Sequence, residues 1–234
     1  MVWPEIGVYV GSGASHSWTW FADIFERNSI YSVIFVDTSF IAQKGLDQVD
    51  ALLVSGGDTF AIAEGLGQEG AQHLRNFIAS GGVYIGSCAG AYLPLKSSHA
   101  PLNLFNFVTS RITNLTSNLP APRKMAEKYC TQYGCQYIFH PVREAVMVRV
   151  VDGFSCAGDE IAAPLYGGPA MTASDDIEVL GVYSSFTRES EFLVDKTLAE
   201  KTLIGNVAMA RKRMGKGVLY LFGPHFEHPH YAAA

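Results

Sequence analysis

The chain has 234 residues, of which 48% are hydrophobic and 17% charged, so it can form the core of one α/β domain and lacks the composition of a disordered chain. Seventeen basic residues against 22 acidic ones give a formal net charge of −5. Apart from Arg211-Lys212-Arg213 the basic residues are scattered, so we do not expect nucleic acid as a partner.

The first half of the chain alternates predicted strands and helices. Short apolar runs predict strands, and apolar residues at helical spacing predict helices between them. The strands fall within residues 5–10, 31–37, 49–58 and 83–88, and the helices within 16–28, 59–66, 69–82 and 89–95. This alternation predicts a parallel sheet with helices on both faces, which binds its ligand beyond the carboxyl ends of the strands.

The second half is less regular. Residues 97–135 have no clear period and predict loops with short helices. Residues 145–153, 160–171 and 177–185 predict strands, which we expect to be antiparallel. A further strand is expected to reach Ala208, and a last one at 218–223 leads into the C-terminal loop. We therefore expect one α/β domain over residues 1–231.

Targeting signals are absent from the sequence as given. No apolar run reaches the roughly 18 residues that a membrane span requires, so no membrane partner is expected. The first residues lack a basic region followed by a long apolar segment, which predicts a cytoplasmic protein. Residues 232–234, all alanine, resemble a cloning scar. The protein would be an exported one if a signal peptide had been removed and Met1 added.

Four cysteines are too few for a disulfide scaffold at this length. Cys130 and Cys135 are close enough in sequence to form a bridge or to contribute to a metal site, but two ordinary thiols are the preferred interpretation. The triplet Asn114-Leu115-Thr116 is a glycosylation sequon, which matters only if the protein is secreted.

Cys88 lies in the stretch "GSCAG", between a predicted strand and a predicted helix. This is the pattern of a nucleophile elbow, in which the turn is strained and side chains two residues away would collide with backbone. Gly86 and Gly90 remove both collisions. The N–H groups of the helix that begins at Ala89 favour the thiolate. The alternative is a small-residue turn with an inert buried cysteine.

A cysteine nucleophile needs a base and a group that orients the base. His225 is followed two positions later by Glu227, and an extended loop would point both side chains to the same side. His225, His228 and His230 could also form a metal cluster, but a solvated histidine-rich loop is preferred. We expect no metal and no cofactor.

Acyl transfer also needs donors for the oxyanion. The N–H of Ala89, directly after the nucleophile, is one candidate. The turn "SGGD" after the third strand supplies a second candidate at Gly57 or Asp58. The alternative for this turn is a plain strand-to-helix connection, with Asp58 as the helix cap.

Three motifs, "SGGDTF", "GSCAGAY" and "GPHFEHP", occur in this order and end at residues 60, 92 and 229. Together they resemble the class I glutamine amidotransferase-like superfamily. The resemblance is closest to the N-terminal domain of biotin-protein ligases and its stand-alone prokaryotic relatives. It spans about residues 6–230. It implies a flavodoxin-like three-layer sandwich with a mostly parallel central sheet and antiparallel strands in the second half. It also implies Cys88 as nucleophile, His225 as base and Glu227 as the partner of that base.

The same resemblance indicates where substrate binds. It places Tyr166, Gly167 and Gly168, which precede Pro169, near the mouth of the site. Tyr92 stands where many glutamine-hydrolysing members have glutamine. The expected substrate is a small-molecule amide or acyl compound.

The leading hypothesis is a cysteine-dependent amide hydrolase or amidotransferase-like enzyme that works through a thioester. The alternatives are a non-catalytic ligand-binding or regulatory module on the same fold, and a glutaminase subunit that serves a separate synthetase. Phe105, Phe107 and Tyr137, if exposed, would permit a homodimer.

Overall fold

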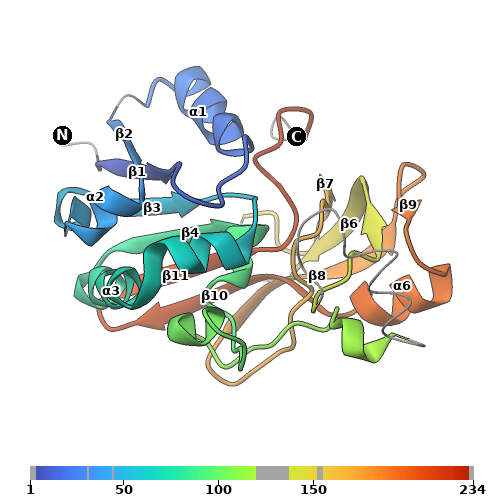
Figure 1. Ribbon diagram of the computed structural model, residues 1–234. Coiled ribbons are helices and arrows are strands. Elements are labelled where there is room, and N and C mark those ends of the chain that lie inside the picture. Colours follow the sequence, from blue (N-terminus) through green and yellow to red (C-terminus); the bar gives the residue numbers. More distant parts are fainter. Residues whose placement is uncertain (1–3, 31, 44, 120–136, 152–154, 232–234) are drawn as a thin grey trace.

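The computed structural model describes residues 4–30, 32–43, 45–119, 137–151 and 155–231 (Figure 1). Within these residues nine strands form one sheet in the order β2-β1-β3-β4-β11-β10-β8-β6-β7. They are β1 Ile6–Tyr9, β2 Val33–Val36, β3 Ala51–Val54, β4 Val83–Ser87, β6 Ala145–Val150, β7 Glu160–Pro164, β8 Glu178–Phe186, β10 Val207–Met214 and β11 Gly217–Phe222. A separate pair joins β5 Val142–Arg143 to β9 Glu191–Phe192.

The helices lie mostly between the strands of the first half. They are α1 Trp18–Arg27, α2 Thr38–Ala42, α3 Thr59–Ser80, α4 Ala89–Tyr92 and α6 Lys196–Leu203, with the 3-10 turns η1 Gly45–Gln48, η2 Leu102–Phe105 and η3 Thr116–Asn118. The two helices predicted at 59–66 and 69–82 form the single span α3, interrupted at Gly67, whose backbone is non-helical.

Strand direction changes in the middle of the sheet. From β2 to β11 every neighbouring pair is parallel, and from β11 to β7 every pair is antiparallel. The predicted fold class, a flavodoxin-like α/β sandwich with antiparallel strands in its second half, is confirmed. The carboxyl ends of β1, β3, β4 and β11 lie at one edge because these strands are parallel.

Apolar side chains on both faces of the parallel strands explain why helices cover the sheet on both sides. Successive side chains of a strand point to opposite faces, and β1 and β3 follow this rule with apolar residues on both. Val8 and Leu53 pack with α1 on one face, whereas Tyr9 and Leu52 pack with α2 and α3 on the other. Strands that are apolar on both faces, as in parallel sheets generally, require this double cover. In Figure 1, α1 and α3 lie on opposite sides of the strands.

Some sequence expectations differ from the structure. The strand expected to end at Ala208 is β10, which begins at Val207 and includes the basic run Arg211-Lys212-Arg213. Helix α6 precedes it and was not predicted. The apolar run of β2 suggested burial on both faces, but β2 is the edge of the sheet and Phe35 is 54% exposed.

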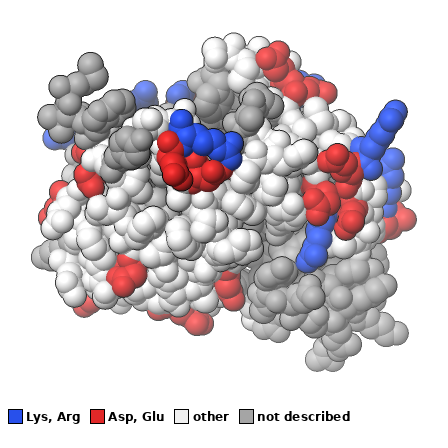
Figure 2. Space-filling model, turned by 90° about the horizontal axis from the view of Figure 1, so that it is seen from above, with Lys and Arg blue, Asp and Glu red and all other residues white. Residues whose placement is uncertain are grey.

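The aromatic residues on which a homodimer interface was expected are mostly in the core. Phe105 and Phe107 are buried, because they pack in the cluster that contains α3, and only Tyr137 of the three is exposed, at 38%. On the face in Figure 2, acidic and basic side chains are interspersed among uncharged ones. No helix in the described ranges is long and apolar enough to cross a membrane.

The sequon asparagine is part of the interior. Asn114 is fully buried, and its amide nitrogen donates hydrogen bonds to the Tyr92 hydroxyl at 2.8 Å and to the Phe139 carbonyl at 2.9 Å. Cys130, Cys135 and residues 232–234 lie outside the described residues.

Candidate functional site

Cys88 has the backbone geometry of a nucleophile elbow. It lies between β4 and α4 with φ 51° and ψ −108°, a conformation that is strained for a residue with a side chain. A Cβ on Gly86 would lie 2.3 Å from the Gly90 carbonyl oxygen, and one on Gly90 would lie 1.9 Å from that of Val54. The spacing of the two glycines is therefore a steric requirement of this turn. Because α4 has only four residues, its dipole contributes little at Cys88.

His225 and Glu227 meet as the loop spacing predicts. Strand β11 is parallel to β4 and ends beside it, so the loop after β11 reaches the elbow. His225 Nδ1 lies 2.7 Å from Glu227 Oε1, and both side chains are buried. The Ser87 hydroxyl donates to both oxygens of the same carboxylate, at 2.8 and 3.0 Å. The carboxylate is thus fixed from two sides and holds the imidazole in one orientation.

Electrostatics favour a protonated His225. Burial would lower the pKa of His225, but the negative charges of Cys88 and Glu227, and the hydrogen bonds to both, raise it to about 10. The interaction with Cys88 places the thiol next to the imidazole. A raised histidine pKa beside a thiol is the condition under which a thiolate–imidazolium pair is stable.

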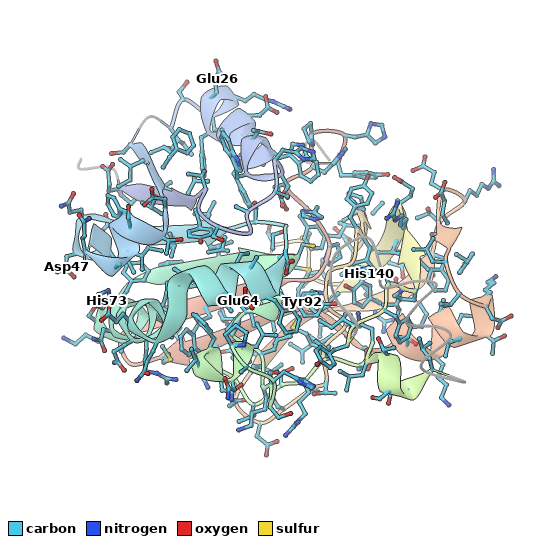
Figure 3. All side chains as sticks on the ribbon, viewed as in Figure 1. Glu26, Asp47, Glu64, His73, Tyr92 and His140 are labelled. Carbon is cyan, nitrogen blue, oxygen red and sulfur yellow. The ribbon has the colours of Figure 1, made fainter. Side chains whose placement is uncertain are left out.

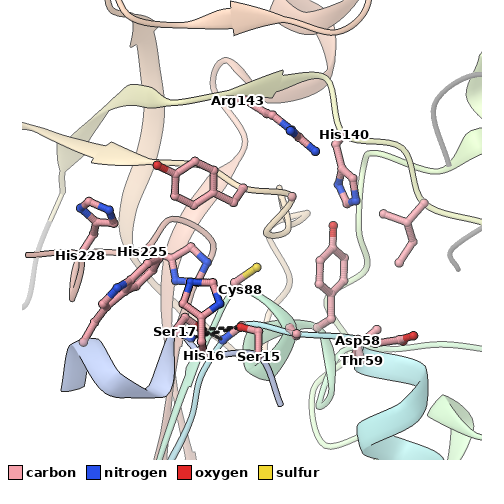
Figure 4. Close-up of a pocket in the computed structure, with 18 of the residues that line it drawn as sticks. Ser15, His16, Ser17, Asp58, Thr59, Cys88, His140, Arg143, His225 and His228 are labelled. Carbon is pink, nitrogen blue, oxygen red and sulfur yellow. Dashed lines mark hydrogen bonds between the residues drawn. The ribbon is translucent and has the colours of Figure 1, made fainter. Parts of the chain in front are cut away.

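A cavity of about 490 Å³ opens over Cys88 (Figure 4). It lies at the carboxyl ends of the parallel strands, as the topology predicts. The loops after β1, β3, β4 and β11 all contribute to its wall, together with residues from the antiparallel half. The lining residues are Ser15, His16, Ser17, Trp20, Gly56, Gly57, Asp58, Thr59, Phe60, Cys88, Ala89, Tyr92, Ile138, His140, Arg143, Tyr166, Gly167, His225 and His228. In Figure 3, Tyr92 and His140 lie between the two halves of the sheet.

The two candidate oxyanion donors of the "SGGD" turn are in different situations. The N–H of Asp58 donates to the Gly13 carbonyl at 2.8 Å, and its carboxylate caps α3 by accepting from the N–H of Phe60 at 2.9 Å. Asp58 therefore has the capping role considered as the alternative. The N–H groups of Gly57 and Ala89 have no hydrogen-bond acceptor among the described residues, and both residues line the cavity.

The predicted substrate-binding residues are only partly brought together. Tyr92, Tyr166 and Gly167 line the cavity, whereas Gly168 does not. A Cβ on Gly168 would lie 1.8 Å from the Gly223 carbonyl oxygen, so Gly168 packs against the start of the C-terminal loop. The Tyr166 hydroxyl donates to Glu144 at 3.0 Å, and burial together with this carboxylate raises the pKa of Tyr166 to about 12.

Sequence reasoning missed the wall formed by the loop after β1 and the start of α1. The Ser17 hydroxyl donates to Ser55 at 3.1 Å and accepts from the N–H of Gly56 at 3.0 Å. The Trp20 ring meets His225 edge to face, with centroids 5.2 Å apart. The sequence signal for this wall is the small-residue stretch "GSGAS" at residues 11–15, directly after the first strand, which is typical of a loop.

His228 and His140 also line the cavity. The described residues contain no group of three or more His, Cys, Asp or Glu arranged to hold a metal ion. His228 instead packs against Trp20, with ring centroids 4.6 Å apart. His140 lines the cavity beside Gly167.

Comparison with known families supports the motifs. Residues 5–105 match the family model "Biotin-protein ligase, N terminal". The resemblance to this family is thereby confirmed over these residues. The match contains β1 to β4 and the elbow, but ends before the His225 loop. No curated protein matches the sequence.

Solved structures with the same fold include glutamine amidotransferase-like proteins. One, from Thermoplasma acidophilum, is assigned as part of a GMP synthase; it has a TM-score of 0.57 and 14% identity, and the alignment covers 98% of this chain and 88% of that one. Another is a glutamine amidotransferase from Thermotoga maritima, with TM-score 0.53, 11% identity and coverages of 95% and 76%.

The fold also occurs as part of a larger enzyme. The β-galactosidase of Bacillus circulans sp. alkalophilus aligns with TM-score 0.52 and 12% identity, over 94% of this chain and 28% of that one. At these identities the likeness is one of fold. The chain has an amidotransferase-like fold.

Proposed function

We propose that the protein is a cysteine-dependent amide hydrolase or acyl transferase. His225 takes the Cys88 proton, the Cys88 Sγ attacks the amide carbonyl, and a C–S bond forms as the carbonyl electrons move onto oxygen. The imidazolium then protonates the leaving nitrogen as the C–N bond breaks, which leaves a thioester on Cys88. His225, neutral again, then takes a proton from water or another acceptor as that acceptor attacks the thioester carbonyl. The C–S bond breaks, the acyl group leaves as the acid or the acylated acceptor, and the proton passes from His225 to the Cys88 sulfur.

The negative oxygen of each tetrahedral intermediate needs donors that are fixed in advance. The N–H groups of Gly57 and Ala89 suit this role, because they line the cavity and lack acceptors among the described residues. Glu227 orients His225 through the 2.7 Å contact to Nδ1. The opposite ring nitrogen is then left for the thiol and the leaving group.

The combination of three features around His225 supports this proposal. His225 is held by Glu227 on one side, interacts with Cys88 on the other, and lies in the wall of a cavity large enough for a ligand. Each of these features alone occurs in proteins without activity. Their combination at an elbow cysteine is the arrangement that thioester chemistry requires.

Alkylation of the cysteines by iodoacetamide, followed by mass spectrometry between pH 5 and 9, tests the pair. An ordinary cysteine has a pKa of about 8.5 and reacts slowly at pH 6. We expect Cys88 to react at pH 6 at least about tenfold faster in wild type than in His225→Ala. Cys156, a free and partly exposed thiol, is the internal reference. If Cys88 reacts no faster than Cys156 in wild type, the catalytic proposal is wrong and the ligand-binding module is favoured.

Turnover needs a separate measurement. Wild type and Cys88→Ala are compared on amides, γ-glutamyl compounds and thioesters. We expect product only with wild type. Equal behaviour of the two proteins across this panel would contradict the proposal.

A second candidate is a glutaminase that supplies ammonia to a separate synthetase. The similarity in fold to the Thermoplasma acidophilum protein, which is assigned to a GMP synthase, favours it. Glutamine hydrolysis that appears only when a synthetase is added would support this candidate. Turnover of free glutamine by the chain alone would remove the need for a partner.

A further inference from the structure

The cavity wall carries few charged side chains. Glu227 is paired with His225, and the Asp58 carboxylate is used in the cap of α3. Burial and the nearby Arg143 charge lower the pKa of His140 to about 4, so its ring is neutral. Among the described lining residues, Arg143 is the one side chain with a permanent positive charge.

Arg143 has no ionic partner within the described part of the chain. The ion pairs there involve other residues. Glu191 lies opposite Arg143 in the β5–β9 pair, but it is exposed and forms no ion pair with Arg143. Glu144, the next residue in the chain, accepts the Tyr166 hydroxyl. Arg143 is partly buried and lines the cavity, so an anionic ligand bound there can pair with its guanidinium.

The opposite wall offers an uncharged hydroxyl beside the capping carboxylate of Asp58. The Thr59 hydroxyl is buried, lines the cavity, and has no hydrogen-bond partner among the described residues. In the view of Figure 4, Arg143 lies at the top and Thr59 with Asp58 at the bottom right, and Cys88 lies at a height between them, to the left. The site thus has one cationic end, and an opposite end with the Thr59 hydroxyl and the capping carboxylate of Asp58.

We propose that Arg143 binds a carboxylate of the substrate, and that the site acts on amides that carry such a group. The inference rests on the proposed function for the reaction, but not for the binding. A planar guanidinium matches a carboxylate through two parallel hydrogen bonds. One cation balances one carboxylate, whereas a doubly charged phosphate would call for more positive charge than this wall supplies. The cavity volume of about 490 Å³ leaves room for more than a carboxamide group.

Calorimetry on the Cys88→Ala protein tests the binding without turnover. The probes are N-acetyl-L-glutamine and N-acetyl-L-glutaminamide, which differ only in a carboxylate against a neutral carboxamide. We expect the carboxylate probe to bind about tenfold tighter or more, as a charge-assisted hydrogen bond implies. In Arg143→Gln the two probes should bind alike, and Arg143→Lys should keep part of the preference.

The matched control is Arg149→Gln, because Arg149 is an exposed arginine on β6 and does not line the cavity. It should keep the full preference. Thermal unfolding of each variant verifies that it is folded. Equal affinities in the Cys88→Ala background, no binding of either probe, or a preference that survives Arg143→Gln would each overturn the inference. Inert Cys88 in the alkylation experiment would instead overturn the proposed function alone.

Discussion

Ser87 is part of the arrangement around the proposed base. Its hydroxyl donates to both oxygens of Glu227 and lies 3.4 Å from His225 Nδ1. It is almost fully buried. Ser87 does not reach the cavity, so its effect on the reaction passes through the orientation of Glu227 and His225.

For Ser87→Ala we expect kcat to fall about tenfold with KM little changed, since losing a hydrogen bond to a charged group costs about 1.5–3 kcal/mol. Steady-state kinetics on the best amide from the panel give both constants. Ser80→Ala is the control, because the Ser80 hydroxyl only donates to the Phe77 carbonyl in α3. An unchanged kcat in Ser87→Ala would mean that His225 alone orients Glu227.

The sequence predicted the residues of this arrangement that have a local signal. Cys88 with its two glycines, and His225 with Glu227, can be recognised from spacing alone. Ser87 and Arg143 have no such signal. Their importance depends on which side chains meet after β11 has paired with β4 and after β5 has formed, and neither contact is visible in one sequence without the fold.

Asp176 connects β10 to the segment that contains Thr109, both of which are distant from it in the chain. It accepts hydrogen bonds from Lys212 Nζ on β10 at 2.7 Å, from the Thr109 N–H at 3.0 Å, and from the Ser174 hydroxyl at 2.8 Å. Burial would raise the pKa of Asp176, but these hydrogen bonds together hold it well below its usual range. The folded state therefore binds this proton more weakly than the unfolded state does.

The contribution of Asp176 to stability depends on pH with a definite sign. A lowered pKa in the folded state stabilises it fully at pH values above the unfolded value of about 3.9, and this contribution is lost as the pH falls from there through the lower pKa of the folded state. We expect Asp176→Asn to lower the free energy of unfolding at pH 7 by about 1–2 kcal/mol, and to lower it by less at pH 3, where the unfolded chain already binds this proton.

Urea unfolding at both pH values measures the difference. Asp175→Asn is the control, because Asp175 is exposed and has no hydrogen-bond partner among the described residues. A loss in Asp176→Asn that is equal at pH 7 and pH 3 would contradict the ionic explanation.

Some strands could be located from the sequence better than others. The parallel strands β1, β3 and β4 are short apolar runs, a pattern that burial on both faces produces. The second half of β10 contains charged residues, which have ionic partners in or just before β8. Arg211 pairs with Glu178, and Lys212 pairs with Asp176. Charged residues satisfied by tertiary partners look like a turn or a helix end in sequence, which is why this strand was misplaced.

In the whole molecule, the sheet changes from parallel to antiparallel pairing at β11, and the cavity lies above this change. Leu219 on β11 is fully buried at the centre of the sheet, whereas Phe35 on the edge strand β2 is 54% exposed. The order of strands in the sheet therefore decides how much each apolar side chain contributes.

We expect Leu219→Ala to lower the free energy of unfolding by about 2–5 kcal/mol, the range found for buried leucines. Phe35→Ala should lower it by less than about 1 kcal/mol, because that side chain is already half in water. Denaturant unfolding of both variants measures the contrast. Similar losses in the two variants would mean that β2 is covered by another molecule in solution.

The buried Asn114 limits how the protein can be produced. A glycan needs a solvent-facing amide nitrogen, and here that nitrogen is fully used inside the core by Tyr92 and Phe139. A sugar attached during synthesis in a eukaryotic secretory pathway would have to be buried, so the modified chain could not reach this fold. Expression in such a host therefore requires either folding before the transferase acts or replacement of Thr116, whereas a bacterial host avoids the conflict.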